Sequence, residues 1–197
     1  MRRAALIALV LGGLGLSPPE ASAHPEDEIV AQLALVMNGP NVTEIDETWL
    51  FSAQTSQWLV QSLNQPQQGP LGPDALNQLV AIVRENTAPS LFYTRLLDGA
   101  QEPPPPAVSD FAAELTASGS LRFSFVLRPV QPLDARTLRL VLSDPDALMD
   151  LRPAPDTPLR LTGDGASACV PILDRNAPSP FDTPDPASLI ARLLCRE

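Results

Sequence analysis

The sequence Leu-Arg-Phe-Ser-Phe-Val-Leu-Arg, residues 121–128, decides the fold class of this chain. Large apolar side chains occupy its first, third, fifth and seventh positions, and this alternation is typical of a β-strand with one buried face. The turn signal Ser118-Gly119 and the segment 111–116 come before it. We therefore predict a β-hairpin over residues 111–128.

The rest of the chain predicts more strands and a helical insertion. Apolar runs bounded by turn residues predict strands at 29–37, 42–49, 90–97, 137–142, 159–162 and 168–173. Residues 51–63 and the stretch from Pro73 to Pro89 have helical spacing instead, and they predict two helices. Trp58 falls on the apolar stripe of the first helix, so we expect it in the core. A last, short helix is expected at 187–194.

In chain order, the strands at 29–37 and 42–49 are expected to form a hairpin across the turn Asn38-Gly39-Pro40-Asn41, and two helices and then several antiparallel strands follow. This order indicates an α+β domain and not an alternating βαβ core. The expected architecture is an antiparallel, β-rich, sandwich-like domain with a two-helix insertion and a short C-terminal helix.

The first 23 residues have the three parts of a secretory signal peptide. Met1-Arg2-Arg3 is basic, residues 4–16 are apolar, and Ala21-Ser22-Ala23 is an A-x-A cleavage motif. The apolar run is too short to span a bilayer, and no stop-transfer segment follows, so we expect no transmembrane helix after cleavage. We predict cleavage after Ala23, a single domain over 24–197 and a periplasmic location.

The composition excludes some classes of partner. The formal net charge is −10 at pH 7, and every basic residue is an arginine. Nucleic acids and anionic lipids bind proteins through a basic footprint, which this chain lacks. We therefore expect no nucleic-acid partner.

Two cysteines, Cys169 and Cys195, lie in the part of the chain expected to be exported. In an oxidising compartment such a pair predicts one disulfide, which would attach the last helix to the body of the domain. A reactive or metal-binding thiol pair is the alternative, but the spacing differs from C-x-x-C.

Cleavage after Ala23 would make His24, the only histidine, the first residue. Its amine and imidazole could chelate a divalent transition metal such as Ni, Cu or Zn, and Glu26, Asp27 or Glu28 could complete the ligand set. Pro25 has no amide hydrogen, so the next backbone nitrogen cannot deprotonate and bind. The alternative is an exposed terminal histidine followed by solvated acids.

The segment 64–75 has the length and punctuation of a calcium-binding helix-loop-helix. Asn64 stands at position 1, Gly69 at position 6 and Leu71 at position 8 of such a loop. The remaining ligand positions, three, five and twelve, hold Pro66, Gln68 and Ala75. This degenerate frame lacks the carboxylates that calcium needs, so a plain turn between two helices is the alternative that we favour.

Several short motifs occur in a characteristic order along the chain. They are Ala23-His24-Pro25, Trp49 before a helix, the 64–75 loop, Leu91-Phe92-Tyr93-Thr94 before Asp98-Gly99, Gly119 with Leu121-Arg122-Phe123, Asp144-Pro145 and Cys169. This order resembles a bacterial family of unknown function, described as the periplasmic component of an uncharacterised ABC-type transport system. The resemblance implies an inner-membrane permease as partner. Members often lie near nickel or cobalt permease genes, which implies metal handling.

The chain departs from the family pattern at three places. Glu26-Asp27-Glu28 follows His24-Pro25 where the family has a second histidine and an aromatic residue. The 64–75 loop has lost its acidic ligands, and Asp146-Ala147-Leu148 replaces the aromatic residues after Asp144-Pro145.

We expect a non-catalytic accessory or binding protein. A Ser-His-Asp triad could be built only on His24, and the chain has no phosphate loop or dinucleotide fingerprint. A hydrolase is the disfavoured alternative. The proline-rich segments 102–107 and 178–186 are candidate contacts for a partner, with simple spacers as the alternative.

Overall fold

The computed structural model describes residues 27–63, 71–146, 148–177, 180–181 and 188–196. Its strands are β1 (Asp27–Asn38), β2 (Asn41–Phe51), β3 (Thr94–Asp98), β4 (Ala107–Leu115), β5 (Leu121–Arg128), β6 (Leu133–Asp134), β7 (Leu138–Leu142), β8 (Met149–Pro153), β9 (Leu159–Gly163), β10 (Cys169–Ala177) and β11 (Ser188–Cys195). Its helices are α1 (Ala53–Gln61), α2 (Pro73–Thr87), and the short 3₁₀ helices η1 (Ala88–Tyr93) and η2 (Ala166–Ala168). The predicted signal peptide lies outside the described residues.

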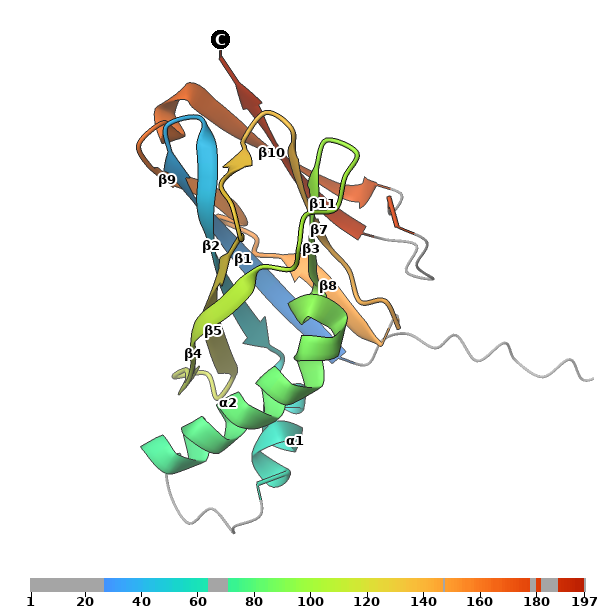
Figure 1. Ribbon diagram of the computed structural model, residues 1–197. Helices are drawn as coiled ribbons and strands as arrows, with labels where there is room; N and C mark the ends of the chain where they lie inside the picture. Colours follow the sequence, from blue (N-terminus) through green and yellow to red (C-terminus); the bar gives the residue numbers. More distant parts are fainter. Residues whose placement is uncertain (1–26, 64–70, 147, 178–179, 182–187, 197) are drawn as a thin grey trace, which may run out of the picture.

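The strands form two sheets, and the predicted α+β, sandwich-like architecture is confirmed (Figure 1). The first sheet has the order β4-β5-β2-β1; β6 pairs with β2, and β8 and β9 both pair with β1 in parallel. The second sheet is antiparallel, in the order β10-β11-β7-β3. The two helices lie together at one end of the sandwich.

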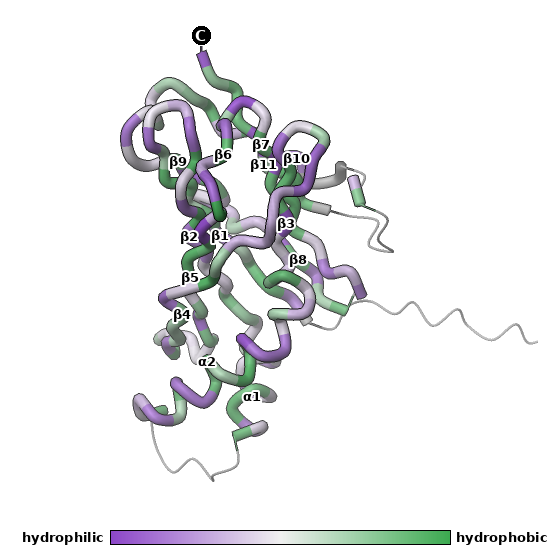
Figure 2. The backbone as a smooth tube through the Cα atoms, in the orientation of Figure 1, coloured by the Kyte–Doolittle hydropathy of each residue, from purple (hydrophilic) through white to green (hydrophobic). Residues whose placement is uncertain are grey.

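A single hydrophobic core joins the two sheets. From the first sheet it takes Leu33 and Phe125, and from the second it takes Leu140 and Ala191. The predicted hairpin is confirmed as β4 and β5, and the side chains at alternate positions of β5, from Leu121 to Leu127, are buried. Hydrophobic stretches of the trace run along strands of both sheets and along α1 (Figure 2).

The two helices of the predicted insertion are confirmed as α1 and α2, but Trp58 on α1 is more exposed than predicted. The buried face of α1 carries Ser56, whose hydroxyl donates to the carbonyl of Ser52 (2.7 Å) and accepts from the backbone N–H of Leu121 (2.8 Å). Trp58 lies two residues further, about 200° around the helix, and is 45% exposed. The prediction that Trp58 belongs to the core is wrong, because a hydrogen-bonded serine occupies the inner face.

The predicted C-terminal helix is also wrong, because residues 188–195 form strand β11. This strand lies between β10 and β7, and Leu189, Ala191 and Leu193 point into the core. Leu194, on the opposite face, is 53% exposed. Pairing with strands on both sides satisfies the backbone groups of this segment, so it does not need helical hydrogen bonds.

The predicted strand at 90–97 begins only at Thr94. Leu91, Phe92 and Tyr93 before it have φ angles of 51°, 54° and 56°, in the left-handed region. Among the described residues, no helix is apolar and long enough to cross a membrane.

Gly165 packs the turn after β9 against the turn between β1 and β2. Its φ is +93°, and a Cβ at this position would overlap the backbone carbonyl of Gly39. Gly119 has a φ of +81°, but nothing lies within 4 Å of its Cβ position. Gly119→Ala should therefore cost only the left-handed backbone penalty, about 1–2 kcal/mol. Gly165→Ala should lower the free energy of unfolding by about 2 kcal/mol more, because of the overlap.

Urea unfolding of the Gly165→Ala and Gly119→Ala variants measures the difference. If both variants lose the same free energy of unfolding, the turn at Gly165 can move away from the turn at Gly39 without an energetic cost.

Candidate functional site

Among the described residues, β7 is the only strand that pairs with β3, so the other side of β3 is an edge of the second sheet. The N–H of Asp98 donates to the carbonyl of Gln101 (2.8 Å), and the N–H of Gln101 donates back to the carbonyl of Asp98 (3.1 Å). The backbone N–H and carbonyl of Asp98 therefore point away from β7. Backbone groups alternate in direction along a strand, so those of Leu96 also point away from β7, toward the chain that follows Gln101.

Prolines stop the hairpin that begins at Asp98 and Gln101. Continued pairing would place residue 103 opposite Leu96 and residue 105 opposite Thr94, but Pro103 and Pro105 have no N–H to donate. A groove of about 520 Å³ lies between the strand and the prolines. It is lined by Leu91, Thr94, Arg95, Leu96, Glu102, Pro103, Pro104, Pro105 and Pro106.

Arg95 and Glu102 connect the two walls of this groove. Nε of Arg95 donates to one carboxylate oxygen of Glu102 (2.8 Å) and Nη2 donates to the other (2.6 Å). The guanidinium carbon of Arg95 also lies 3.3 Å from the ring centroid of Phe181. The charges of these two residues therefore compensate each other, and the leucines and prolines make the rest of the groove largely apolar.

A second hollow, of about 210 Å³, shares Leu91 and Arg95 with the groove. Ser143 and Pro145 line it, and between them Asp144 is only 2% exposed. Its carboxylate accepts hydrogen bonds from the backbone N–H groups of Asp146 (3.0 Å), Leu148 (2.9 Å) and Met149 (2.8 Å). These bonds fix the Asp-Pro turn beside η1.

Aromatic packing holds the left-handed segment 91–93 in place. The ring centroid of Phe92 lies 5.6 Å from that of Phe125, and the centroid of Tyr93 lies 5.7 Å from that of Trp49. Left-handed backbone costs about 1–2 kcal/mol for each residue other than glycine. Such strain persists only where the surroundings determine it, and it is most common at functional sites.

Glu47 lies beneath the groove, between the two sheets. It projects from β2 and is 1% exposed. Thr94 Oγ1 donates to one of its carboxyl oxygens (2.7 Å), and Trp49 Nε1 donates to the other (3.2 Å). Burial raises the pKa of Glu47 to about 8, against the lowering effect of these two hydrogen bonds.

Glu47 was missed as a candidate residue, although the sequence holds a signal for it. In the predicted strand at 42–49, Glu47 lies on the same inward-facing side as Ile45 and Trp49. A carboxylate at an inward position is unusual and predicts a hydrogen-bonded or functional group.

The predicted metal ligands are only partly described. His24 and Glu26 lie outside the described residues, as does the side chain of Asp27, whose backbone begins β1. A carboxylate oxygen of Glu28 lies 3.2 Å from Nη1 of Arg152, in an ion pair. In the described part of the chain, no cluster of three or more histidine, cysteine, aspartate or glutamate side chains could hold a metal ion. The N-terminal metal site stays a prediction.

Of the degenerate calcium-loop frame, Asn64 and Gly69 lie outside the described residues. Leu71 is partly buried and packs against the core, as expected for position 8 of such a loop. The calcium-loop resemblance therefore stays a prediction.

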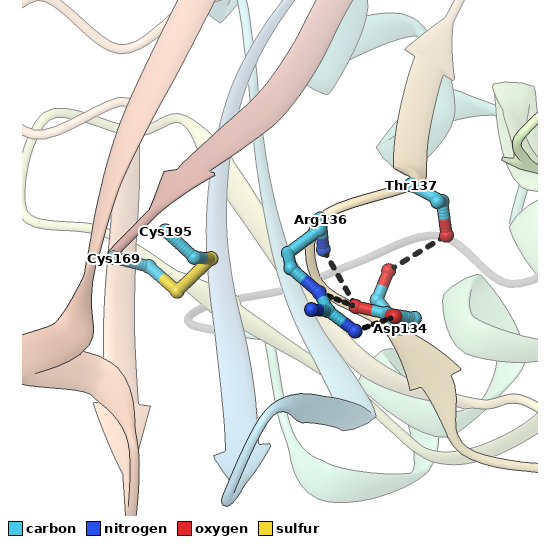
Figure 3. Close-up of a disulfide and its surroundings, with 5 residues drawn as sticks. All are labelled: Asp134, Arg136, Thr137, Cys169 and Cys195. Carbon is cyan, nitrogen blue, oxygen red and sulfur yellow. Dashed lines mark hydrogen bonds and ion pairs between the residues drawn. A yellow bond between two sulfur atoms is a disulfide. The ribbon is translucent and has the colours of Figure 1, made fainter. Parts of the chain in front are cut away.

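The predicted disulfide is confirmed: Cys169 and Cys195 are bonded and lie opposite each other in β10 and β11 (Figure 3). Nearby, Asp134 accepts hydrogen bonds from the backbone and guanidinium of Arg136. These bonds lower the pKa of Asp134 to about 2.

A family model described as "Protein of unknown function (DUF1007)" matches residues 8–191. No curated protein matches the chain.

Proposed function

The chain belongs to this family of proteins of unknown function, and from that premise we propose that it is a non-catalytic, exported binding protein. Its partner is an inner-membrane permease, and together they serve a metal-ion transport system. The β3 groove binds an extended segment of that partner. The observation that carries this proposal is the edge of β3 at Leu96, which no described strand pairs and which faces prolines that cannot close it.

An unpaired strand edge beside an apolar wall suits an extended peptide. The N–H and carbonyl of Leu96 can pair with a peptide backbone, as in β-strand addition. The prolines and Leu91 offer apolar contacts for the side chains of the peptide. Prolines also protect edge strands against unwanted pairing, so the groove favours a specific segment over general aggregation.

The chemistry of the groove supports a non-catalytic role. Arg95 and Glu102 are bonded to each other, and the Thr94 hydroxyl donates to Glu47. Thr94 lines the groove, but its hydroxyl is engaged with Glu47, and both residues are only 1% exposed. A general base must lie within hydrogen-bonding reach of its substrate.

The disulfide supports export, because disulfides persist in oxidising compartments such as the periplasm. Expression of the full chain with a C-terminal tag, followed by fractionation and N-terminal sequencing, tests this directly. A periplasmic product that begins at His24 is expected; a cytoplasmic product that retains residues 1–23 would contradict export.

Two proline variants test the groove. Pro103→Thr with Pro105→Thr supplies N–H groups opposite Leu96 and Thr94, so the hairpin closes and the groove is lost. Pro104→Thr with Pro106→Thr is the matched control, because those N–H groups would point away from β3. We expect the first variant to lose at least about tenfold in co-purification of permease from solubilised membranes, and the control to retain it.

Equal co-purification by both proline variants would exclude the groove as the binding site. Nickel and cobalt uptake by a deletion strain tests the transport association separately, and unchanged uptake would contradict it.

A further inference from the structure

The outer face of the second sheet carries an exposed apolar pair. Val170 on β10 and Leu194 on β11 lie directly opposite each other and are 59% and 53% exposed. Their neighbours in sequence, Cys169 and Leu193, point into the core. Ile172, two residues after Val170, lies on the same outer face and is partly buried.

Two arginines lie beside this apolar pair. Arg139 on β7 and Arg192 on β11 are directly opposite each other in the ladder, and both are exposed. Like charges that face each other across neighbouring strands destabilise a sheet. We call the surface formed by Arg139, Arg192, Val170, Ile172 and Leu194 the arginine face.

Neither Arg139 nor Arg192 forms an ion pair among the described residues, although the exposed Asp174 on β10 lies on the same outer face, two residues after Ile172, which pairs with Arg192. Nη2 of Arg139 donates only to the backbone carbonyl of Gly99 (3.1 Å). The other arginine on this side of the sheet, Arg95, is bonded to Glu102. The remaining described arginines that form ion pairs are Arg122, Arg128, Arg136 and Arg152.

The arginine pair is unexpected in this chain. Acidic residues outnumber basic ones by 23 to 13, so an internal carboxylate could easily have been placed opposite either arginine. Two adjacent cations within an apolar frame are instead complementary to an anionic, partly apolar surface.

We propose that the arginine face docks an acidic, amphipathic segment of a partner protein. Two carboxylates of that segment pair with Arg139 and Arg192, and its apolar side chains cover Val170 and Leu194. Neighbouring strands lie about 4.8 Å apart, and residues four apart on a helix have Cβ atoms about 5–6 Å apart. A helix with glutamates at i and i+4 therefore matches the arginine spacing. The arginine face is separate from the β3 groove, so this proposal does not rest on the proposed function.

A synthetic helical peptide with glutamates at i and i+4 beside a leucine stripe is the probe, and calorimetry with the chain that begins at residue 24 measures its binding. The double variant Arg139→Glu with Arg192→Glu should bind at least about tenfold more weakly. The variant Arg84→Glu with Arg160→Glu is the matched control. It makes the same change in net charge at exposed sites on α2 and β9, and its affinity should stay within about twofold of wild type. Val170→Ser with Leu194→Ser tests the apolar part and should also weaken binding.

Circular dichroism and urea midpoints verify that every variant folds. A version of the peptide with lysines in place of glutamates should not bind. The proposal is overturned if the glutamate peptide fails to bind wild type, or if it binds wild type and the Arg139/Arg192 variant equally. Stronger binding to anionic phospholipid vesicles, or a dimer in sedimentation that the Arg139/Arg192 variant loses, would assign the arginine face to a membrane or a second copy and also overturn it.

Discussion

Wild-type protein will lose stability between pH 5 and pH 8, and the Glu47→Gln variant will not. Burial raises the pKa of Glu47 from 4.5 to about 8. Between these two values the folded chain holds a proton that the unfolded chain has released. The stabilising contribution of this proton is complete below pH 4.5, falls as the pH rises, and is lost above about pH 8. One such group changes the free energy of unfolding by at most about 1.4 kcal/mol per pH unit.

Glutamine can replace the protonated glutamate without leaving a buried polar atom unpaired. Its side-chain oxygen can accept from Trp49 Nε1, and its amide can donate to Thr94 Oγ1, since a hydroxyl both donates and accepts. Glutamine does not titrate, so the variant should be nearly insensitive to pH in this range. Above pH 8 it should be more stable than wild type, because no buried charge forms.

Urea unfolding at pH 5, 6.5 and 8 measures this effect. Glu114→Gln, which removes an exposed carboxylate paired with Arg122, is the control and should keep the wild-type slope. Asp134 does not interfere, because its pKa of about 2 places its effect at lower pH. Parallel slopes for wild type and Glu47→Gln would show that Glu47 titrates normally in the folded chain.

Local periodicity predicted most of the fold. The alternation in 121–128 and the stripe after Pro73 correspond to β5 and α2, because each pattern matches a face that the core buries. Residues 188–195 were harder to assign. Leu189 and Leu193 are four apart, as on a helix face, but with Ala191 they also fit a strand. Pairing with β7, which is distant in sequence, decided between the two.

Other features have no local signal. The parallel pairing of β1 with β8 and β9 joins segments more than a hundred residues apart. The segment 91–93 is rich in residues that favour strands, but aromatic packing holds it in the left-handed region. The proline-rich segment 102–107 stays a predicted contact for a partner. Its position beside the free edge of β3 depends on the tertiary fold, so the groove was not predictable.

Removing the disulfide will lower the free energy of unfolding by roughly 3 to 4 kcal/mol, as expected for a loop of this length. Cys169 and Cys195 are 26 residues apart in sequence and bonded across β10 and β11. The bond limits the conformations of the unfolded chain, whereas the folded ladder already holds the two residues together. Cys169→Ala with Cys195→Ala is the suitable variant, since Cys169 is 8% exposed and a buried serine hydroxyl would add its own cost.

Two measurements separate the effect of the bond from the effect of the substitution. Wild type unfolded in urea with a reducing agent should match the alanine variant, and oxidised wild type should exceed both. The alanine variant should also have a larger m value, because its unfolded state is less compact. Hydrogen exchange should quicken first in β10, since among the described strands it lies at the edge of the second sheet and pairs with β11 alone. If reduction leaves the midpoint of oxidised protein unchanged, the bond adds no net stability and the loop-entropy explanation is wrong.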